Sequence, residues 1–141
     1  KSVWSKRYEM INQFELLLAE RGTRILKFYL HISPREQLER FKERLDLPEK
    51  HWKLNISDYE AREKWGQYRE AYEAVFEKCS TEKAPWFVIP ADKKWYRNAA
   101  VSSIVYQTLK EMDPQLPKVD VDLDEIRSLY EREQAKLDGN S

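Results

Sequence analysis

Glycine is scarce in this 141-residue sequence, and its scarcity excludes a familiar kind of phosphate site. The three glycines are Gly22, Gly66 and Gly139, each far from the others along the chain. A glycine-rich phosphate loop needs several closely spaced glycines, because its backbone amides must approach the phosphate without a side chain in the way. The chain therefore contains no glycine-rich phosphate-binding loop.

Groups that bind metals or act as nucleophiles are also few. Cys79 is the single cysteine, so the chain forms no internal disulfide and suits a reducing cytosol. His31 and His51 are too far apart in sequence for a metal-binding motif, and no serine stands in a nucleophile elbow. We interpret Cys79 as a packing residue and His31 as a core or strand-end residue, and we predict no metal site.

An excess of charge of one sign is missing, since 25 basic side chains balance 25 acidic ones. A general binder of nucleic acid or of a membrane surface is usually basic, so we predict neither partner. No apolar run approaches the roughly 20 residues that span a bilayer, and the first residues do not resemble a secretion signal. We therefore predict a cytoplasmic protein.

Hydrophobic periodicity predicts helices that alternate with two short strands. The first helix should end at Gly22, in the left-handed conformation. The apolar runs 25–32 and 86–89 predict buried strands, the first covered on both faces. Ser33 and Ser57 each begin a capping box that a glutamate completes, and Asp92 is a further expected helix cap. Two helices carry apolar or aromatic faces made of these residues: Trp4, Tyr8, Ile11, Phe14, Leu18, Trp65, Tyr68, Tyr72, Val75, Phe76 and Cys79.

The order helix, strand, helix, helix, strand, helix predicts an α/β fold with a parallel sheet. Two strands are too few to cover the helices around them, so we predict that residues 1–118 are half of an α/β domain. Residues 119–141 are predicted to form an acidic tail, helical to about Lys136, which packs outside the core or docks on a neighbouring subunit.

A basic stretch from Arg40 to Lys53 is the candidate functional segment. Arg40 and Arg44 are one helical turn apart, and guanidinium groups suit phosphate oxygens. Pro48 should end the helix, and Lys50 and Lys53 follow on a loop that would let them close over the same anion. This pattern is typical of a mobile, phosphate-gripping lid. The alternative interpretation is a solvated helix, because acidic residues lie among the bases: Glu36, Glu39, Glu43, Asp46 and Glu49.

Five blocks of the sequence resemble the carboxy-terminal half of the polyphosphate kinase 2 family. The first two, RYEMINQFE and ILKFYLHIS, cover the first predicted helix and strand. The third, RLDLPEKHWKLNISDYEAREKW, contains most of the candidate lid. The last two are STEKAPWFVIPADKKWYRN, around the second strand, and EMDPQLP. The blocks stand in the family's order and extend from about Arg7 to Pro117.

The resemblance implies a P-loop kinase fold, with a three-layer α/β/α core and a helical lid at about residues 40–60. It implies transfer of phosphoryl groups between inorganic polyphosphate and nucleoside mono- or diphosphates, with Mg²⁺ as cofactor. It places Arg40 and Arg44 as catalytic residues of the lid, and Lys50 and Lys53 as phosphate or polyphosphate ligands. The loop after the last strand would lie near the nucleotide through these residues: Asp92, Lys93, Lys94 and Arg97.

The family's Walker A loop and Walker B aspartate belong to its amino-terminal half, which these residues do not match. We therefore expect no magnesium ligand in this chain and no activity from the chain alone. Two alternatives stay open. One is a polyanion- or nucleotide-binding module without catalysis, and the other is an assembly role in which Trp65, Tyr68 and Tyr72 bury against another subunit. Polyphosphate and nucleotide are the predicted partners, within a homo-oligomer.

Overall fold

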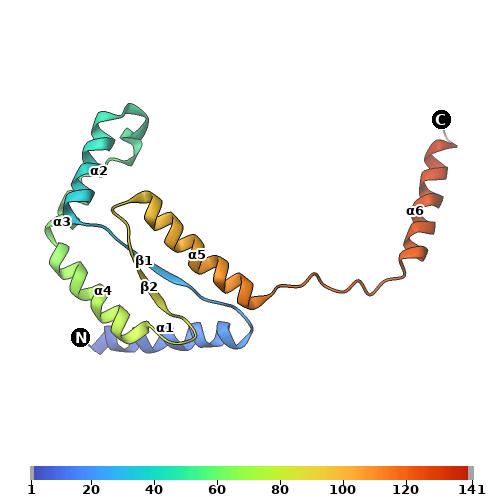
Figure 1. Cartoon of the computed structure of the whole chain (residues 1–141), viewed down its shortest axis with the longest axis horizontal. Coiled ribbons are helices and arrows are strands. Elements are labelled where there is room, and N and C mark those ends of the chain that lie inside the picture. The colour runs from blue at the N-terminus through green and yellow to red at the C-terminus, as the bar shows by residue number, and fades with distance from the viewer. Residues whose placement is uncertain (1, 140–141) are drawn as a thin grey trace.

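A two-stranded parallel sheet lies at the centre of the computed structural model, which describes residues 2–139, with side chains from residue 4 on (Figure 1). Strand β1 spans Lys27–His31 and strand β2 spans Trp86–Pro90. The two strands pair residue by residue along their whole length. The predicted parallel pairing is confirmed, and both strands end at the same edge of the sheet.

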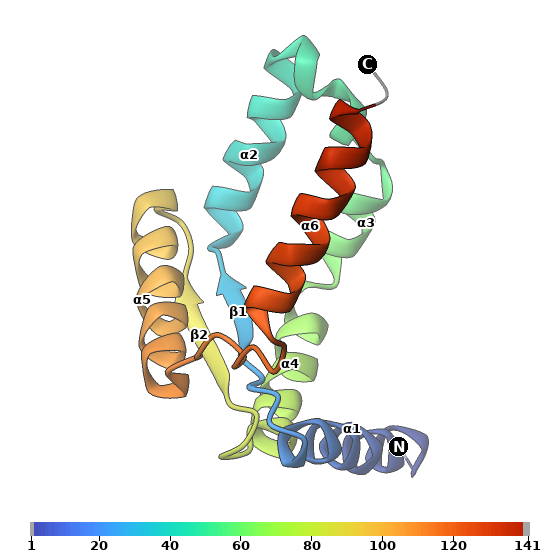
Figure 2. The ribbon, with the colours of Figure 1, turned by 90° about the vertical axis from the view of Figure 1, so that its right-hand side faces the viewer.

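Helices cover both faces of this sheet. Helix α5 lies over one face and α4 over the other, and α1 crosses the end of α4 near the start of the strands (Figures 1 and 2). The helices have these bounds: α1 Ser2–Glu20, α2 Pro34–Asp46, α3 Ser57–Glu63, α4 Trp65–Cys79, α5 Lys94–Met112 and α6 Leu123–Asp138, with a 3-10 helix, η1, at Pro48–Lys53. The described residues therefore form helix, sheet and helix layers, as an α/β fold requires.

Aromatic side chains fix the helices to the two faces of the sheet. Tyr29 of β1 packs against Tyr72 and Phe76 of α4, with ring centroids 4.5 and 5.2 Å away. The neighbouring residue, Phe28, points to the opposite face and stacks on Phe87 of β2 at 5.5 Å. Because strand side chains alternate between faces, one strand serves both helical layers. Part of the predicted aromatic face of α4 is thus used for packing inside the chain.

The prediction that β1 is buried on both faces is wrong for this chain. Leu30 of β1 is 46% exposed and Val88 of β2 is 52% exposed. Two strands offer too little width to fill both faces, so the apolar runs remain partly uncovered within the described residues. The buried hydrophobic residues are Phe41, Cys79, Ala84, Ile89 and Ala91.

The predicted helix ends are confirmed at two places. Helix α1 stops before Gly22, whose φ of +87° is the left-handed conformation that glycine adopts without strain. There the N–H of Thr23 donates to the carbonyl of Leu18 at 3.1 Å. At the start of α2, the hydroxyl of Ser33 accepts the N–H of Glu36 at 3.1 Å, as an N-cap does.

Helix α3 does not begin with the predicted cap at Ser57. Its N-cap is Ile56, whose side chain cannot hydrogen-bond to the helix end. The N–H of Ser57 donates instead to Oδ1 of Asn55 at 3.0 Å, which begins the turn earlier in the chain. The helix also breaks at Lys64, where ψ rises to 17°. The single predicted helix is therefore two, α3 and α4.

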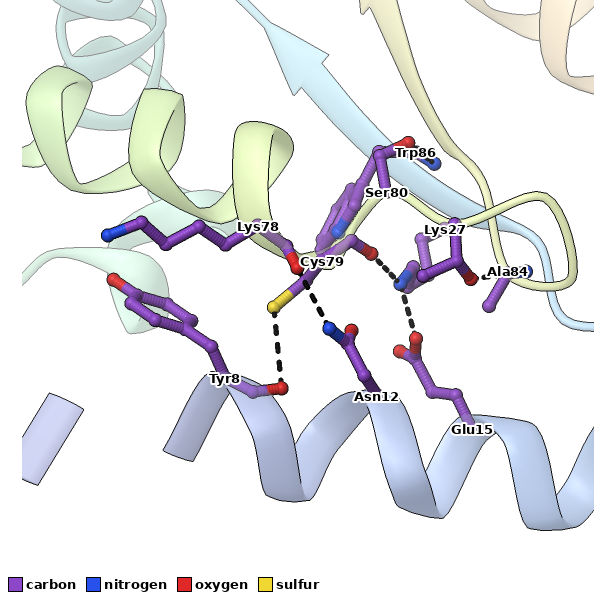
Figure 3. Close-up of polar contacts among 10 residues, drawn as sticks. Tyr8, Asn12, Glu15, Lys27, Lys78, Cys79, Ser80, Ala84 and Trp86 are labelled. Carbon is purple, nitrogen blue, oxygen red and sulfur yellow. Dashed lines mark hydrogen bonds and ion pairs between the residues drawn. The ribbon is translucent and has the colours of Figure 1, made fainter. Parts of the chain in front are cut away.

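A partly buried ion pair joins α1, β1 and α4 (Figure 3). Nζ of Lys27 lies 2.6 Å from Oε2 of Glu15 and donates to the carbonyl of Cys79 at 2.6 Å. The side chains of Lys27 and Glu15 are only 12% and 11% exposed. Asn12 adds a bond from α1 to the carbonyl of Lys78 at 2.9 Å. These bonds hold α1 across the end of α4 and the start of β1.

Cys79 is 1% exposed and confirms the interpretation as a packing residue. Burial raises the pKa of its thiol. Because the thiolate is the nucleophilic form, this environment makes the side chain a poor nucleophile at neutral pH.

The predicted tail is a straight helix, α6, that lies apart from the rest of the chain (Figure 1). A segment without regular structure, residues 113–122, leads to it, and Asp122 caps it by accepting N–H groups of the first turn. All described side chains of α6 are exposed. Among the described residues, no helix has the length and apolar character to cross a membrane.

We predict that Lys27→Met lowers the free energy of unfolding by about 3 kcal/mol, because it leaves the carboxylate of Glu15 buried without its partner. Urea unfolding followed by circular dichroism measures this change. Lys42→Met is the matched control, since its ion pair with Asp46 is largely exposed and should contribute less than about 1 kcal/mol. Equal losses in the two variants would contradict the structural role of the Lys27 pair.

Candidate functional site

The carboxyl ends of the two strands bring two loops together. The N–H of Ala91, just after β2, donates to the carbonyl of His31 at 2.7 Å, which extends the pairing past the end of the sheet. Helix α2 begins beyond one strand and α5 beyond the other. Ligands of open α/β sheets bind at this edge. His31 lies at the strand end, which is one of the two positions predicted for it, the core or a strand end.

A cavity of about 460 Å³ opens at this edge. Most of its lining is apolar or aromatic, with Trp95, which is 72% exposed, on its wall. The lining residues are His31, Ser33, Pro90, Ala91, Asp92, Lys93, Trp95 and Tyr96. A larger cavity of about 890 Å³ lies between α1 and α4. We take the smaller one as the candidate site, because it lies where the strands end and contains two of the predicted site residues.

Asp92 binds across this edge and does not cap α5. Its Oδ1 accepts the backbone N–H of Ser33 at 2.7 Å. The N-cap of α5 is Lys93, which makes no side-chain capping bond, so the prediction that Asp92 caps a helix is wrong. The bond from Ser33 is the main cause that holds the pKa of Asp92 below its ordinary value. Asp92 thus ties the loop after β2 to the start of α2.

Arg40 reinforces the same connection. Its Nη2 donates to the carbonyl of Ala91 at 2.8 Å, and its Nε donates to Oε1 of Glu36 at 2.8 Å. The predicted capping box at Ser33 is therefore incomplete, because Glu36 turns to Arg40 and Asp92 accepts the Ser33 N–H in its place. A guanidinium has five N–H donors, so Arg40 keeps three that these bonds do not use.

Arg44, one turn along α2, faces a different neighbour. Its Nη1 lies 3.3 Å from Oδ2 of Asp58 in α3, and its guanidinium lies 5.4 Å from the ring of Phe41. Phe41 is 6% exposed and packs against Tyr59 at 5.0 Å. This contact fixes α3 to the middle of α2. Arg40 and Arg44 share a helix, but in the structure their guanidinium groups bind different partners.

Lys50 and Lys53 lie on η1, beyond the end of α2. Nζ of Lys50 forms an ion pair with Oε1 of Glu43. Nζ of Lys53 lies 4.8 Å from the centre of the ring of Trp52, which is 80% exposed. Lys53, which was predicted to grip a phosphate beside Lys50, is therefore exposed and lies against Trp52.

The basic residues around the start of α5 also differ in their partners. Lys94 acts on the carboxylate of Glu43 across the gap between α5 and α2, whereas Arg97 binds its neighbour Asn98 at 2.8 Å. Lys93 lines the cavity at the strand ends. Lys50 thus contacts Glu43 directly, Arg40 and Lys94 act on the same carboxylate through their charge, and Lys53 and Arg97 take no part in this group.

Sequence reasoning assigned no function to Ser33, Glu43 or Trp95. The partners of Ser33 and Glu43 lie between 3 and 59 residues away, and the distant ones are not visible from spacing along a helix. A signal was present for two of the three residues: Glu43 is an acidic residue inside a basic stretch, and Trp95 is an aromatic residue next to two lysines after a strand.

Magnesium is implied by the resemblance, and the described residues do not fit it. Among residues 2–139, no three histidine, cysteine, aspartate or glutamate side chains lie close enough to hold a metal ion. Asp92 and Glu43 are each bound to other groups of the chain. No step involving magnesium is therefore assigned to any residue of this chain.

A parallel sheet between helical layers, with basic side chains beyond the ends of its strands, defines an α/β protein whose ligand site is expected at that edge. Residues 1–117 match the family model described as Polyphosphate kinase 2 (PPK2). The chain belongs to this family.

Individual relatives agree with this membership. The chain is 54% identical, over 118 residues, to the AMP/ADP-polyphosphate phosphotransferase of Meiothermus ruber, covering 84% of this chain and 44% of that protein. It is 47% identical to an uncharacterised protein of Leptolyngbya boryana, covering 83% of this chain and 86% of that protein. The chain thus spans less than half of the named enzyme, and most of the other relative.

A solved structure confirms the fold. The crystal structure of polyphosphate kinase 2 from Arthrobacter aurescens TC1 is similar to this chain with a TM-score of 0.84 and 43% identity. The similarity covers 94% of this chain and 47% of the crystallised one. The α/β fold is therefore part of a P-loop kinase-like core, as predicted. The family match ends at residue 117, whereas the structural similarity covers more of the chain and therefore extends into the tail.

We predict that Asp92→Asn loses less folding stability than the wild type when the pH is lowered. The folded state holds the Asp92 carboxylate ionised below its ordinary pKa, so the charged bond to Ser33 contributes stability above about pH 4. That contribution is lost as pH falls through the lowered pKa of the folded state. Urea midpoints between pH 6 and pH 2.5 should therefore fall less in the variant than in the wild type.

Asp120→Asn is the control, because Asp120 lies in the exposed segment before α6 and should leave the pH dependence unchanged. If Asp92→Asn and wild type lose stability in parallel, Asp92 does not tie the two loops through its charge.

Proposed function

We propose that this chain is part of a polyphosphate:nucleotide phosphotransferase, to which it supplies the lid and the loop on the nucleotide side. The observation that carries the proposal is a group of basic residues beyond the carboxyl edge of the parallel sheet, in which Lys50 pairs with Glu43 and the charges of Arg40 and Lys94 act on the same carboxylate. Support comes from the Meiothermus ruber relative, which is named an AMP/ADP-polyphosphate phosphotransferase. The proposed substrates are inorganic polyphosphate and a nucleoside mono- or diphosphate.

The chemistry of phosphoryl transfer suits such an arrangement. The transition state spreads charge over the oxygens of the transferred group, and proteins accelerate the reaction mainly by positioning and electrostatic stabilisation. Basic side chains held by secondary structure supply both. Polyphosphate is a dense polyanion, so a basic edge on the lid would also guide it, with an affinity that falls as salt concentration rises.

In this proposal the predicted residues have separate tasks. Arg44 and the unused donors of Arg40 bind the transferring phosphates, while the bonds from Arg40 to Glu36 and Ala91 hold its guanidinium in place. Lys50 and Lys53 bind polyphosphate. The proposed nucleotide-proximal residues lie on the loop after β2 and at the start of α5: Asp92, Lys93, Lys94 and Arg97. Asp92 acts through Ser33 and is a positioning residue.

The proposed lid, residues 40–60, comprises the last part of α2, all of η1 and the start of α3. It projects beyond the end of the sheet, away from α1 (Figure 1). Closure of a lid over bound phosphates excludes water that would hydrolyse the donor. In the same scheme, residues 1–118 are the core part and residues 119–141 are the tail.

Several expectations accompany the proposal and stay predictions. Magnesium is expected as cofactor, with its ligands outside this chain. The chain alone is expected to be inactive, because it contains no Walker A sequence. A homo-oligomer and a cytoplasmic location are also predicted. The apolar residues that α6 exposes would serve assembly: Leu123, Ile126, Leu129, Tyr130 and Leu137.

We predict that Arg44→Ala lowers the turnover of the protein that carries this chain roughly tenfold to a hundredfold, because a charged donor to the transferring phosphate is lost. Initial rates of nucleotide phosphorylation by polyphosphate measure the change. Arg127→Ala is the matched control, since Arg127 forms an exposed ion pair with Asp124 of α6, apart from the proposed site.

Wild-type turnover in Arg44→Ala would remove Arg44 from the mechanism. Salt-sensitive binding of polyphosphate without any turnover in the wild type would favour the binding module over the enzyme.

A further inference from the structure

One carboxylate of α2 pairs with one lysine and feels the charge of two further cations. Glu43 forms an ion pair with Lys50 of η1, seven residues along the chain. Lys94, at the start of α5 and 51 residues from Glu43, and Arg40, in the preceding turn of α2, act on the same carboxylate through their charge. Together they hold the pKa of Glu43 below its ordinary value, with the hydrogen bond from Lys50 as the largest cause.

The other acidic residues of α2 do not share this environment. Glu36 binds Arg40 near the sheet, and Asp46 pairs with Lys42 on an exposed surface. Among the described acidic residues of α2, only Glu43 forms an ion pair with η1. A carboxylate at the surface does not need several cations near it, because water solvates it at little cost.

A carboxylate and a phosphate present the same kind of group to a lysine, namely anionic oxygens that accept charge-assisted hydrogen bonds. A phosphate offers more oxygens and at least as much charge. A cluster of cations arranged around a carboxylate is therefore also arranged to receive a phosphate, provided that the carboxylate can leave.

The exposure of the pair allows this exchange. The side chains of Glu43 and Lys50 are 41% and 30% exposed, so an anion can approach without opening the core. The ion pair also folds η1 back against α2, together with a contact of 3.0 Å between Nε2 of His51 and the carbonyl of Leu45. Loss of the Glu43–Lys50 pair would loosen η1, while the contact between His51 and Leu45 would keep η1 attached to α2.

We propose that Glu43 occupies a phosphate subsite of the unliganded protein, and that a substrate phosphate displaces it from Lys50. The proposal rests on the proposed function and adds to it an internal competitor. Displacement couples binding to the lid, because the lysine that receives the phosphate is the one that held η1 against α2. The subsite takes a phosphate group of polyphosphate or of the nucleotide.

The test is Glu43→Gln in the protein that carries this chain, which removes the charge and keeps the shape of the side chain. We expect a severalfold lower KM for polyphosphate, and a severalfold tighter binding of tripolyphosphate by calorimetry at low salt, because Lys50 is no longer neutralised. Measuring KM for the nucleotide separately identifies the source of the phosphate. If only that KM falls, the subsite receives the nucleotide and the exchange still holds.

Glu39→Gln is the matched control, because it removes the same charge from the same helix one turn earlier, and it should leave both KM values unchanged. A double-mutant cycle with Lys50→Ala gives the sharpest comparison. The gain from Glu43→Gln should disappear in the Lys50→Ala background, since the released lysine is then absent.

An active wild-type protein whose affinity is unchanged or weakened by Glu43→Gln overturns this inference alone. The same holds if Glu39→Gln produces an equal gain, since net charge then explains it. A wild-type protein that neither binds nor uses polyphosphate overturns the proposed function and this inference with it.

Discussion

Parallel pairing of β1 with β2 is the constraint on which the rest of the structure depends. It places the loop before α2 and the loop before α5 at one edge, 59 residues apart in sequence but joined by the bond from Ser33 to Asp92. The bond from Ala91 to His31 continues the pairing into these loops. On the opposite end, Lys27 fixes α1 and α4 to the start of the sheet. The end of the sheet where the strands begin is therefore held by a partly buried ion pair. The end where the strands finish carries polar contacts between loops.

These polar contacts give the candidate site a particular character. Most of its charged groups already have partners within the chain, so a ligand must exchange with them rather than enter an empty basic surface. Arg40 and Asp92 use part of their bonding capacity to join the two loops, whereas Lys50 pairs with the carboxylate of Glu43. A site of this kind would select ligands that compete well for lysine, and phosphates do so.

Local features were predictable from the sequence, and features that depend on distant contacts were not. The stop at Gly22, the hydroxyl cap at Ser33 and the parallel order of the strands follow from residue type, spacing and element order. The cap at Asp92 was wrongly predicted, because its true partner lies on another loop. The strands proved more exposed than their apolar runs indicated, since burial depends on neighbours that two strands do not supply. The acidic residues of the lid suggested an ordinary solvated helix, but one of them is the centre of the basic group.

The most direct test of the account is the structure of the protein that carries this chain with a short polyphosphate bound. The account predicts phosphate oxygens within hydrogen-bond distance of Lys50, beyond the carboxyl ends of β1 and β2, with the Glu43 carboxylate turned away. Polyphosphate bound elsewhere, for example in the cavity between α1 and α4, with the Glu43–Lys50 pair intact, would contradict it.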